Sequence, residues 1–217
     1  MNHPLILSFD TSAAHCAVAL FCGDKVLADR VQPMTKGQAE ALFPMLESLL
    51  AQAGKTWRDL TAIGCGIGPG NFTGTRLSVA AARGLALSLG IPAIGVNSFD
   101  ALCHGQNGPC LALIDARRNQ LYAQHIGAKT QDAPGLFTRQ DLIPRFKGKI
   151  DHVLGHDAET IAASLGVAPA LPADPLAVAI ARITAQRFGQ PAPRPAPLYL
   201  KSADAAPSRD APPVLLS

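Results

Sequence analysis

The sequence has few charged side chains. Asp, Glu, Lys and Arg make up 16% of its 217 residues, below the roughly 25% of an average soluble protein. Apolar residues make up 48%, which argues against intrinsic disorder, since disorder requires low hydrophobicity and high charge. The net charge is only +3 and no run of Lys or Arg accompanies it. The electrostatic signature of a stand-alone nucleic-acid-binding protein is therefore weak.

Long apolar runs and paired cysteines are also lacking. The longest uncharged stretches, residues 60–75 and 84–99, are interrupted by Gly and Pro and fall short of the roughly 18 apolar residues that span a membrane. The first ten residues lack the basic region and cleavage site of a signal peptide. Five Cys form no CxxC pair and leave an odd number. We expect free thiols, no membrane association and a cytoplasmic location.

Signatures of hydrolases and metal sites are missing as well. No Ser lies in a GxSxG elbow, so a peptidase has no support, although a catalytic triad spread through the sequence stays open. Of the six His, only His152 and His156 are four residues apart. The Val-Leu-Gly between them predicts a strand and a loop, not the shared helical face that a HExxH zinc site requires. We therefore expect no metal site formed by these residues.

The pattern that is present alternates strands with helices, as in an α/β protein. Short apolar runs that end at polar turns predict a three-stranded opening. Apolar residues at helical spacing then alternate with further strands, and each helix is expected to end at a Gly. The expected strands are residues 5–9, 16–21, 25–31, 60–66 and 91–96, and the expected helices are residues 38–53 and 75–89.

The second half repeats the opening. An apolar run at residues 110–115 ends in Asp115, and a turn and a second run at residues 121–126 follow it. The first half has the same unit around Asp10, 105 residues earlier. This echo predicts a duplicated fold with an Asp at the same place in each half; chance similarity of two hairpins is the alternative. Further elements are expected at residues 139–146, 152–155, 158–165 and 175–188.

Two lobes are expected, residues 1–98 and residues 99–217, the second with a Pro-rich tail. Seven of the 18 prolines follow residue 190, which predicts an extended connector at residues 191–197. Residues 197–201 are expected to dock as an ordered segment, because they carry one of only two Tyr. The last dozen residues are expected to fray.

A Gly-rich loop at residues 66–76 joins an expected strand to an expected helix. Free N–H groups at a helix N-terminus attract anions, so this context suits a phosphate, with Arg76 one turn further along. The loop is not a P-loop, since Thr75 instead of Lys follows Gly74, and it is not a GxGxxG fingerprint. The alternative is a tight turn in which Gly permits close backbone packing.

Asp10 and Asp115 each end an expected strand. Two such carboxylates facing one cleft would suit a hydrated Mg²⁺ beside a nucleotide. Close approach of the backbone to phosphates normally calls for Gly, and neither turn contains one; Arg117 and Arg118 stand in the second. The simpler interpretation is that each Asp caps its own turn.

The two helices expected in the first lobe are apolar around much of their circumference, more than a one-sided surface helix needs. The second is rich in Ala and Gly. Either both helices are wholly buried within the chain, or one face is covered by a partner.

Five segments occur in the order found in the TsaB (YeaZ) family: residues 6–11, 68–76, 84–86, 115–118 and 197–201. The chain resembles this family over residues 4–201, and residues 68–76 are the specific part of the resemblance. The resemblance implies an actin/Hsp70-like ATPase fold of two RNase H-like lobes, the second reduced. It also implies a non-catalytic subunit of tRNA threonylcarbamoyladenosine biosynthesis in the cytoplasm.

In that family, the partner is TsaD, which carries the metal-binding His pair and forms the threonylcarbamoyl group on N6 of adenosine 37 in tRNAs reading ANN codons. The resemblance implies a heterodimer with TsaD, with the ATPase TsaE joining, and a homodimer through the same helices as an option. tRNA would bind through the complex. No cofactor is expected on the isolated chain, whereas ATP and Mg²⁺ act in the complex.

The resemblance also assigns site residues. The expected partner-binding residues lie on the two apolar helices and are Leu42, Met45, Leu46, Leu49, Phe72, Arg76, Leu77, Ala81 and Leu85. The expected vestigial nucleotide cleft is formed by Asp10, Thr11, Gly68, Gly70 and Asp115. No catalytic residue is expected.

The chain departs from the family at three places. Gln38, Ala39 and Glu40 stand where relatives commonly have His-Ser-Glu, Asn71 replaces a usual Ser, and Lys201 replaces a usual Arg. These departures count against catalysis but not against partner binding. The alternative function is an active Mg-ATP-dependent enzyme of the actin-like class that uses Asp10 and Asp115.

Overall fold

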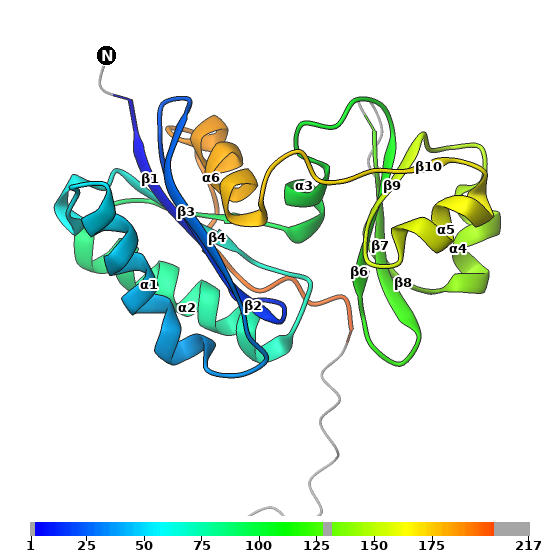
Figure 1. Ribbon diagram of the computed structural model, residues 1–217, viewed down its shortest axis with the longest axis horizontal. Helices are drawn as coiled ribbons and strands as arrows, with labels where there is room; N and C mark the ends of the chain where they lie inside the picture. The colour runs from blue at the N-terminus through cyan, green and yellow to red at the C-terminus, as the bar shows by residue number, and fades with distance from the viewer. Residues whose placement is uncertain (1–2, 128–131, 202–217) are drawn as a thin grey trace, which may run out of the picture.

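The computed structural model describes residues 3–127 and 132–201, and shows two lobes, each built on a five-stranded sheet (Figure 1). The first sheet has the order β3-β2-β1-β4-β5. Its strands are β1 (Leu5–Asp10), β2 (His15–Cys22), β3 (Lys25–Pro33), β4 (Ala62–Gly66) and β5 (Ala93–Val96). The central strands are buried along their whole length, because helices cover both faces of the sheet.

Two helices, α1 (Gln38–Gln52) and α2 (Phe72–Leu89), cover one face of this sheet. A short 3₁₀ helix, η1 (Trp57–Asp59), follows α1. The apolar stripe of α1, which includes Leu42 and Leu46, packs with the side chains of β1 and β2 in one continuous core. Burial of this stripe explains why the helical spacing was visible in the sequence.

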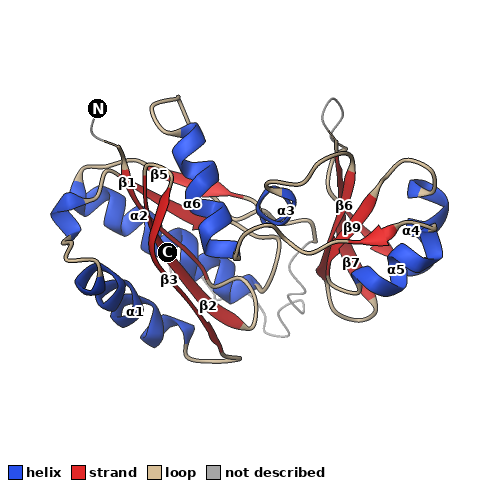
Figure 2. Cartoon of the chain, turned by 45° about the horizontal axis from the view of Figure 1, so that its top comes forward, coloured by secondary structure: helices blue, strands red, loops and turns tan. Residues whose placement is uncertain are grey.

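The opposite face of the first sheet is covered by α6 (Leu176–Arg187), which comes after the second sheet in the chain (Figure 2). Ser8 of β1 donates a hydrogen bond through its hydroxyl to the carbonyl oxygen of Ala177, at 2.7 Å. The last helix that packs on the first lobe thus comes from the part of the chain that follows residue 98. The boundary expected at that residue stays a prediction, but a purely sequential division does not describe the packing.

The second sheet has the order β10-β9-β6-β7-β8. Its strands are β6 (Cys110–Asp115), β7 (Gln120–Ile126), β8 (Gly135–Thr138), β9 (His152–Gly155) and β10 (Ala168–Pro169). Two short helices, α4 (Arg139–Phe146) and α5 (Ala158–Leu165), bury one core with this sheet. A third, α3 (Ser98–Cys103), contacts both the second sheet and α6, and so lies where the lobes meet.

The two sheets share one connection pattern. In the first, β1 pairs antiparallel with β2 and parallel with β4. In the second, β6 pairs antiparallel with β7 and parallel with β9. The echo in the sequence therefore reflects a repeated fold, and the expected α/β architecture of two actin-like lobes, the second reduced, is confirmed.

Most expected elements are present, with ends shifted by a few residues. Helix α2 begins at Phe72 instead of residue 75, because Asn71 caps it. Helix α3, strands β8 and β10 and the 3₁₀ helix η1 were not expected; they have six, four, two and three residues, too few for a periodic pattern. None of the helices described is long and apolar enough to cross a membrane. The segment expected to fray lies outside the described residues.

Candidate functional site: the interlobe cavity and the Gly-rich loop

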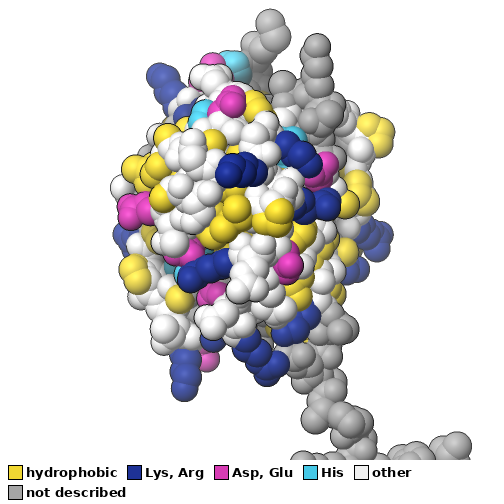
Figure 3. Space-filling view, turned by 90° about the vertical axis from the view of Figure 1, so that its right-hand side faces the viewer, with side chains coloured by type: hydrophobic (Ala, Val, Ile, Leu, Met, Phe, Trp, Pro, Cys, Tyr) yellow, Lys and Arg dark blue, Asp and Glu magenta, His cyan; other side chains and the backbone are white. Residues whose placement is uncertain are grey.

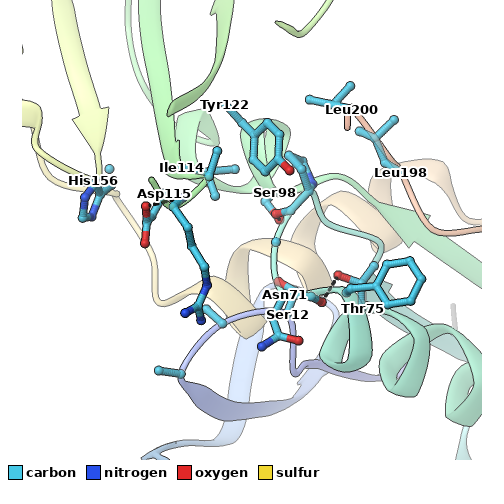
Figure 4. Close-up of a pocket in the computed structure, with 18 of the residues that line it drawn as sticks. Ser12, Asn71, Thr75, Ser98, Ile114, Asp115, Tyr122, His156, Leu198 and Leu200 are labelled. Carbon is cyan, nitrogen blue, oxygen red and sulfur yellow. Dashed lines mark hydrogen bonds between the residues drawn. The ribbon is translucent and has the colours of Figure 1, made fainter. Parts of the chain in front are cut away.

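A cavity of about 990 Å³ lies between the lobes. The first lobe contributes the turn after β1 and the start of α2, including Ser12 and Asn71, and the second contributes Asp115 and His156 (Figure 4). Leu198 and Leu200 of the C-terminal segment close one side, and both tyrosines of the sequence, Tyr122 and Tyr199, line the wall. The volume and the largely apolar wall are typical of small-molecule sites.

The Gly-rich loop packs directly onto the turn after β1. A Cβ on Gly74 would collide with the carbonyl oxygen of Thr11, and one on Gly70 would collide with that of Ser12. The Thr11 hydroxyl donates a hydrogen bond to the Gly74 carbonyl oxygen at 2.7 Å, and the Asn71 N–H donates to the Ser12 carbonyl oxygen. Gly70 and Gly74 therefore serve close backbone packing, the second of the two interpretations of this loop.

The N-terminus of α2 is capped by a side chain of the chain itself. The Asn71 Oδ1 accepts hydrogen bonds from the N–H groups of Thr73 and Gly74, at 3.0 and 3.2 Å. Since these are donors that a phosphate at a helix N-terminus would use, the cap competes with an anion at this place. Asn71, at one of the three places where the chain departs from the family, is thus the capping residue of α2.

Asp10 is fully buried and binds its own turn. Its Oδ1 accepts hydrogen bonds from the N–H and the hydroxyl of Ser12, both at 2.9 Å, and lies 2.9 Å from Nε2 of His15. Its Oδ2 has no hydrogen-bond partner among the described residues and lies under Gly66, where a Cβ would collide with it.

Two buried thiols lie near Asp10. Burial, and secondarily the charge of Asp10, raises the pKa of Cys16 to about 11 and that of Cys65 to about 12. Both causes disfavour a thiolate, so neither thiol is prepared to act as a nucleophile.

Asp115 also caps its own turn, since its Oδ1 accepts a hydrogen bond from the Arg117 N–H at 2.8 Å. Arg117, Arg118 and Asn119 follow with φ values of 62°, 52° and 58°. Three successive non-Gly residues in the left-handed region are strained, and this backbone presents side chains where Gly would let phosphates approach.

The expected shared cleft of Asp10 and Asp115 needs correction. The described part of the cavity wall includes Gly70 and Asp115, but not Asp10, Thr11 or Gly68. Asp10 lies below the loop, in the core of the first lobe. Within residues 3–127 and 132–201, no group of three His, Cys, Asp or Glu side chains is placed to hold a metal ion. The arrangement does not fit a Mg²⁺ held jointly by the two aspartates.

The residues expected to bind a partner divide by burial. Leu42, Met45, Leu46, Leu49 and Ala81 are buried in the first lobe, so their side chains are not available to a partner, and the expectation is corrected for these five. Leu77 and Leu85 are half-buried, while Phe72 and Arg76 are exposed. The sequence identified the apolar stripes, but both stripes face the sheet.

Two motifs that lie far apart in the sequence, residues 68–76 and 197–201, meet at the rim of the cavity. The Leu198 N–H donates to the carbonyl oxygen of Ile67 at 2.8 Å. The Arg76 Nε donates to the Tyr199 hydroxyl at 2.7 Å, and the Arg76 guanidinium lies 3.7 Å from the centre of the Phe72 ring. Residues 197–201 therefore dock as an ordered segment, as expected. Ile114 and Tyr122 of the cavity wall had no distinguishing signal, since they lie in an ordinary apolar strand pattern.

A family model described as TsaD: tRNA N6-adenosine threonylcarbamoyltransferase matches residues 26–136, just over half of the chain. The chain is 34% identical over 122 residues to the tRNA threonylcarbamoyladenosine biosynthesis protein TsaB of Escherichia coli, which is 54% of this chain and 52% of that protein. It is 36% identical over 120 residues to TsaB of Bacillus subtilis, with 54% and 52% covered. The chain thus matches about half the length of these relatives.

The structure is similar to YeaZ from Pseudomonas aeruginosa, with a TM-score of 0.74 at 24% identity over 91% of this chain and all of that one. Similarity to the ethanolamine utilization protein EutJ from Carboxydothermus hydrogenoformans is weaker, with a TM-score of 0.52 at 14% identity over 83% and 90%. At these identities, the two structures establish the fold alone. The chain belongs to the family of the TsaD model, and its relatives there are the TsaB/YeaZ proteins.

Proposed function

We propose that this chain is a non-catalytic subunit that binds and activates TsaD in the formation of the threonylcarbamoyl group on N6 of adenosine 37, in tRNAs reading ANN codons. The names of the TsaB relatives support the process. The observation that supports the non-catalytic role is that the turns that carry Asp10 and Asp115 are each closed by the chain's own hydrogen bonds. Asp10 and Asp115 each accept hydrogen bonds from their own turns, and Asn71 caps the helix that follows the loop.

The surface offered to the partner is the exposed side of α1 and α2. Phe43 of α1 and Leu87 of α2 are exposed, 41% and 86% respectively. A Cβ added to Gly84 would meet nothing within 4 Å, so a second helix can approach α2 closely there. Exposed apolar side chains on two helices that cover the same face of the sheet suit a protein interface.

The proposal also covers the components that join this chain and TsaD in the complex. ATP and Mg²⁺ act in the complex and not on the isolated chain, TsaE joins it, and it works in the cytoplasm. Lys and Arg are scattered over the face of the second lobe without forming a strip (Figure 3). With a net charge of +3, most phosphate contacts with tRNA would come from TsaD. A homodimer through α1 and α2 would compete with the heterodimer.

The test uses size-exclusion chromatography with light scattering on the chain, alone and mixed with TsaD from the same organism. We expect a new 1:1 species, and tRNA modification by TsaD and TsaE that depends on this chain. Absence of a complex at tens of micromolar, with modification unchanged when the chain is omitted, would refute the proposal.

One observation favours the alternative, an active Mg-ATP-dependent enzyme. The buried Oδ2 of Asp10 has no partner among the described residues, and the neighbouring cavity has the volume of a ligand site. Calorimetry with Mg-ATP on the isolated chain separates the two functions. Micromolar binding that is lost in Asp10→Ala would support the enzyme, whereas the absence of any heat of binding would support the non-catalytic subunit.

A further inference from the structure

Arg76 is held in a fixed orientation by two aromatic side chains. Its guanidinium lies over the Phe72 ring at 3.7 Å from the ring centre, and its Nε donates to the Tyr199 hydroxyl at 2.7 Å. The two rings are themselves in contact, with centres 5.2 Å apart. Tyr199 comes from the C-terminal segment, 123 residues after Arg76. We call these three side chains the Arg76 cluster.

The Arg76 cluster is exposed and lacks an acid. Phe72 and Tyr199 are 42% and 46% exposed, and Arg76 is exposed as well. No carboxylate among the described residues forms an ion pair with Arg76. Because Nε is used by Tyr199, the two terminal nitrogens of the guanidinium remain for an outside group, in the fork geometry that matches a carboxylate. Arg and Tyr next to exposed apolar surface are the residue types that carry most of the binding energy in protein interfaces.

We infer that the Arg76 cluster receives a carboxylate of the protein partner and that Tyr199 is a positioning residue, which holds Arg76 in the orientation that the carboxylate requires. This inference rests on the proposed function, and it adds the chemistry of the contact and a role for the C-terminal segment. The two motifs, residues 68–76 and 197–201, then act as one recognition element.

A protein carboxylate is favoured over an RNA phosphate by the exposed apolar side chains beside the cluster. Helix α2 carries Arg76 and Arg83 and no acid, but α1, on the same face of the sheet, carries Glu40 and Glu47, both exposed. Two exposed acids on that helix disfavour a nucleic-acid backbone, which carries a charge at every nucleotide, more than they disfavour a single carboxylate. Helical spacing places Ala80 and Leu87 on the same face of α2 as Arg76, and both are exposed, which suits an apolar protein contact.

The test is calorimetric titration of the full chain with TsaD from the same organism, in low and high salt. We expect Arg76→Ala to weaken binding about 30-fold, as for an interface residue of this kind. Arg76→Lys should weaken it by a similar factor, since Lys neither stacks nor forms the fork. Tyr199→Phe, which removes only the hydroxyl, should weaken it about fivefold, as expected for one exposed hydrogen bond. Lys149→Ala, an exposed cation of the second lobe, should leave it unchanged.

A rescue experiment distinguishes recognition from a structural role. Arg76→Glu should abolish binding, and one Asp→Lys or Glu→Lys variant of TsaD should restore it, because the reversed pair is again complementary. If wild-type chain does not bind TsaD, the proposed function and this inference both fail. If it binds and Arg76→Ala stays within twofold of wild type, only the inference fails. Loss of affinity for an unmodified tRNA stem-loop, with TsaD binding intact, would also overturn it in favour of a phosphate.

Discussion

Gly74, in the first turn of α2, lies directly against the backbone carbonyl of Thr11, in the turn after β1, and the Thr11 hydroxyl donates to the Gly74 carbonyl oxygen at 2.7 Å. The contact is between backbone atoms on both sides, so neither side can give way by a change of rotamer. It fixes the Gly-rich loop to the first turn of the sheet. A side chain larger than that of Gly at position 74 has no room there.

Gly74→Ala should therefore destabilise the fold by about 3 kcal/mol, as for an overpacked core site that cannot relax. Gly84→Ala is the matched control on the same helix, since its added Cβ meets open space. That change should stabilise the protein by about 0.5–1 kcal/mol, the helix propensity gained. Urea unfolding followed by circular dichroism measures both. Equal midpoints for the two variants would show that the Thr11 contact is not tight in solution.

Phe43 and Leu46 of α1 test which side of the helix binds the partner. Phe43 is 41% exposed and Leu46 is fully buried. Phe43→Asp should change the free energy of unfolding by less than about 0.5 kcal/mol but weaken the complex with TsaD. Leu46→Ala should cost about 3 kcal/mol of stability through the cavity that it leaves.

Two quantities are measured for each variant. The first is the urea midpoint of unfolding, and the second is the Kd for TsaD at a urea concentration well below that midpoint. Leu46→Ala should retain wild-type affinity while it is folded. A large loss of affinity in folded Leu46→Ala, with Phe43→Asp unaffected, would restore the buried stripe as the binding face.

The sequence predicted the fold well because periodic apolar patterns report burial directly. The repeated unit around Asp10 and Asp115 predicted the two lobes, and these hairpins are present in both sheets. The partner-binding residues were less predictable. An apolar stripe shows that one helix face is covered, but not whether the sheet of the same chain or another protein covers it. The contact of Tyr199 with Arg76 joins residues 123 positions apart, and no local pattern encodes such a pairing.

The position of α6 on the first sheet leads to a prediction about whether residues 1–98 can fold alone. Ala177, Val178 and Ala181 pack on the face of the first sheet that α1 and α2 leave open. A fragment of residues 1–98 should therefore expose that face, bind a hydrophobic dye and aggregate. The same fragment joined through a flexible linker to residues 173–190 should be monomeric and show cooperative unfolding. A monomeric, cooperatively folded 1–98 fragment would show instead that the expected boundary defines an independent unit.

The buried thiol of Cys65 should make stability fall at high pH. Burial raises its pKa to about 12 in the folded protein, from 9.0 in the unfolded chain. Between these values the folded state holds a proton that the unfolded state has lost, so the free energy of unfolding decreases as pH rises. The slope contributed by one thiol approaches about 1.4 kcal/mol per pH unit.

Urea midpoints at pH 8.5, 9.5 and 10.5 measure this slope, with Cys65→Ala as the control. The variant starts from a lower stability because of its smaller side chain, but its stability should fall less steeply over the same range. Cys16, whose pKa burial also raises, is present in both proteins, so the difference between the two slopes isolates the Cys65 thiol. Parallel slopes would mean that Cys65 loses its proton as readily in the folded protein as in the unfolded chain, and that water reaches the core beside Asp10.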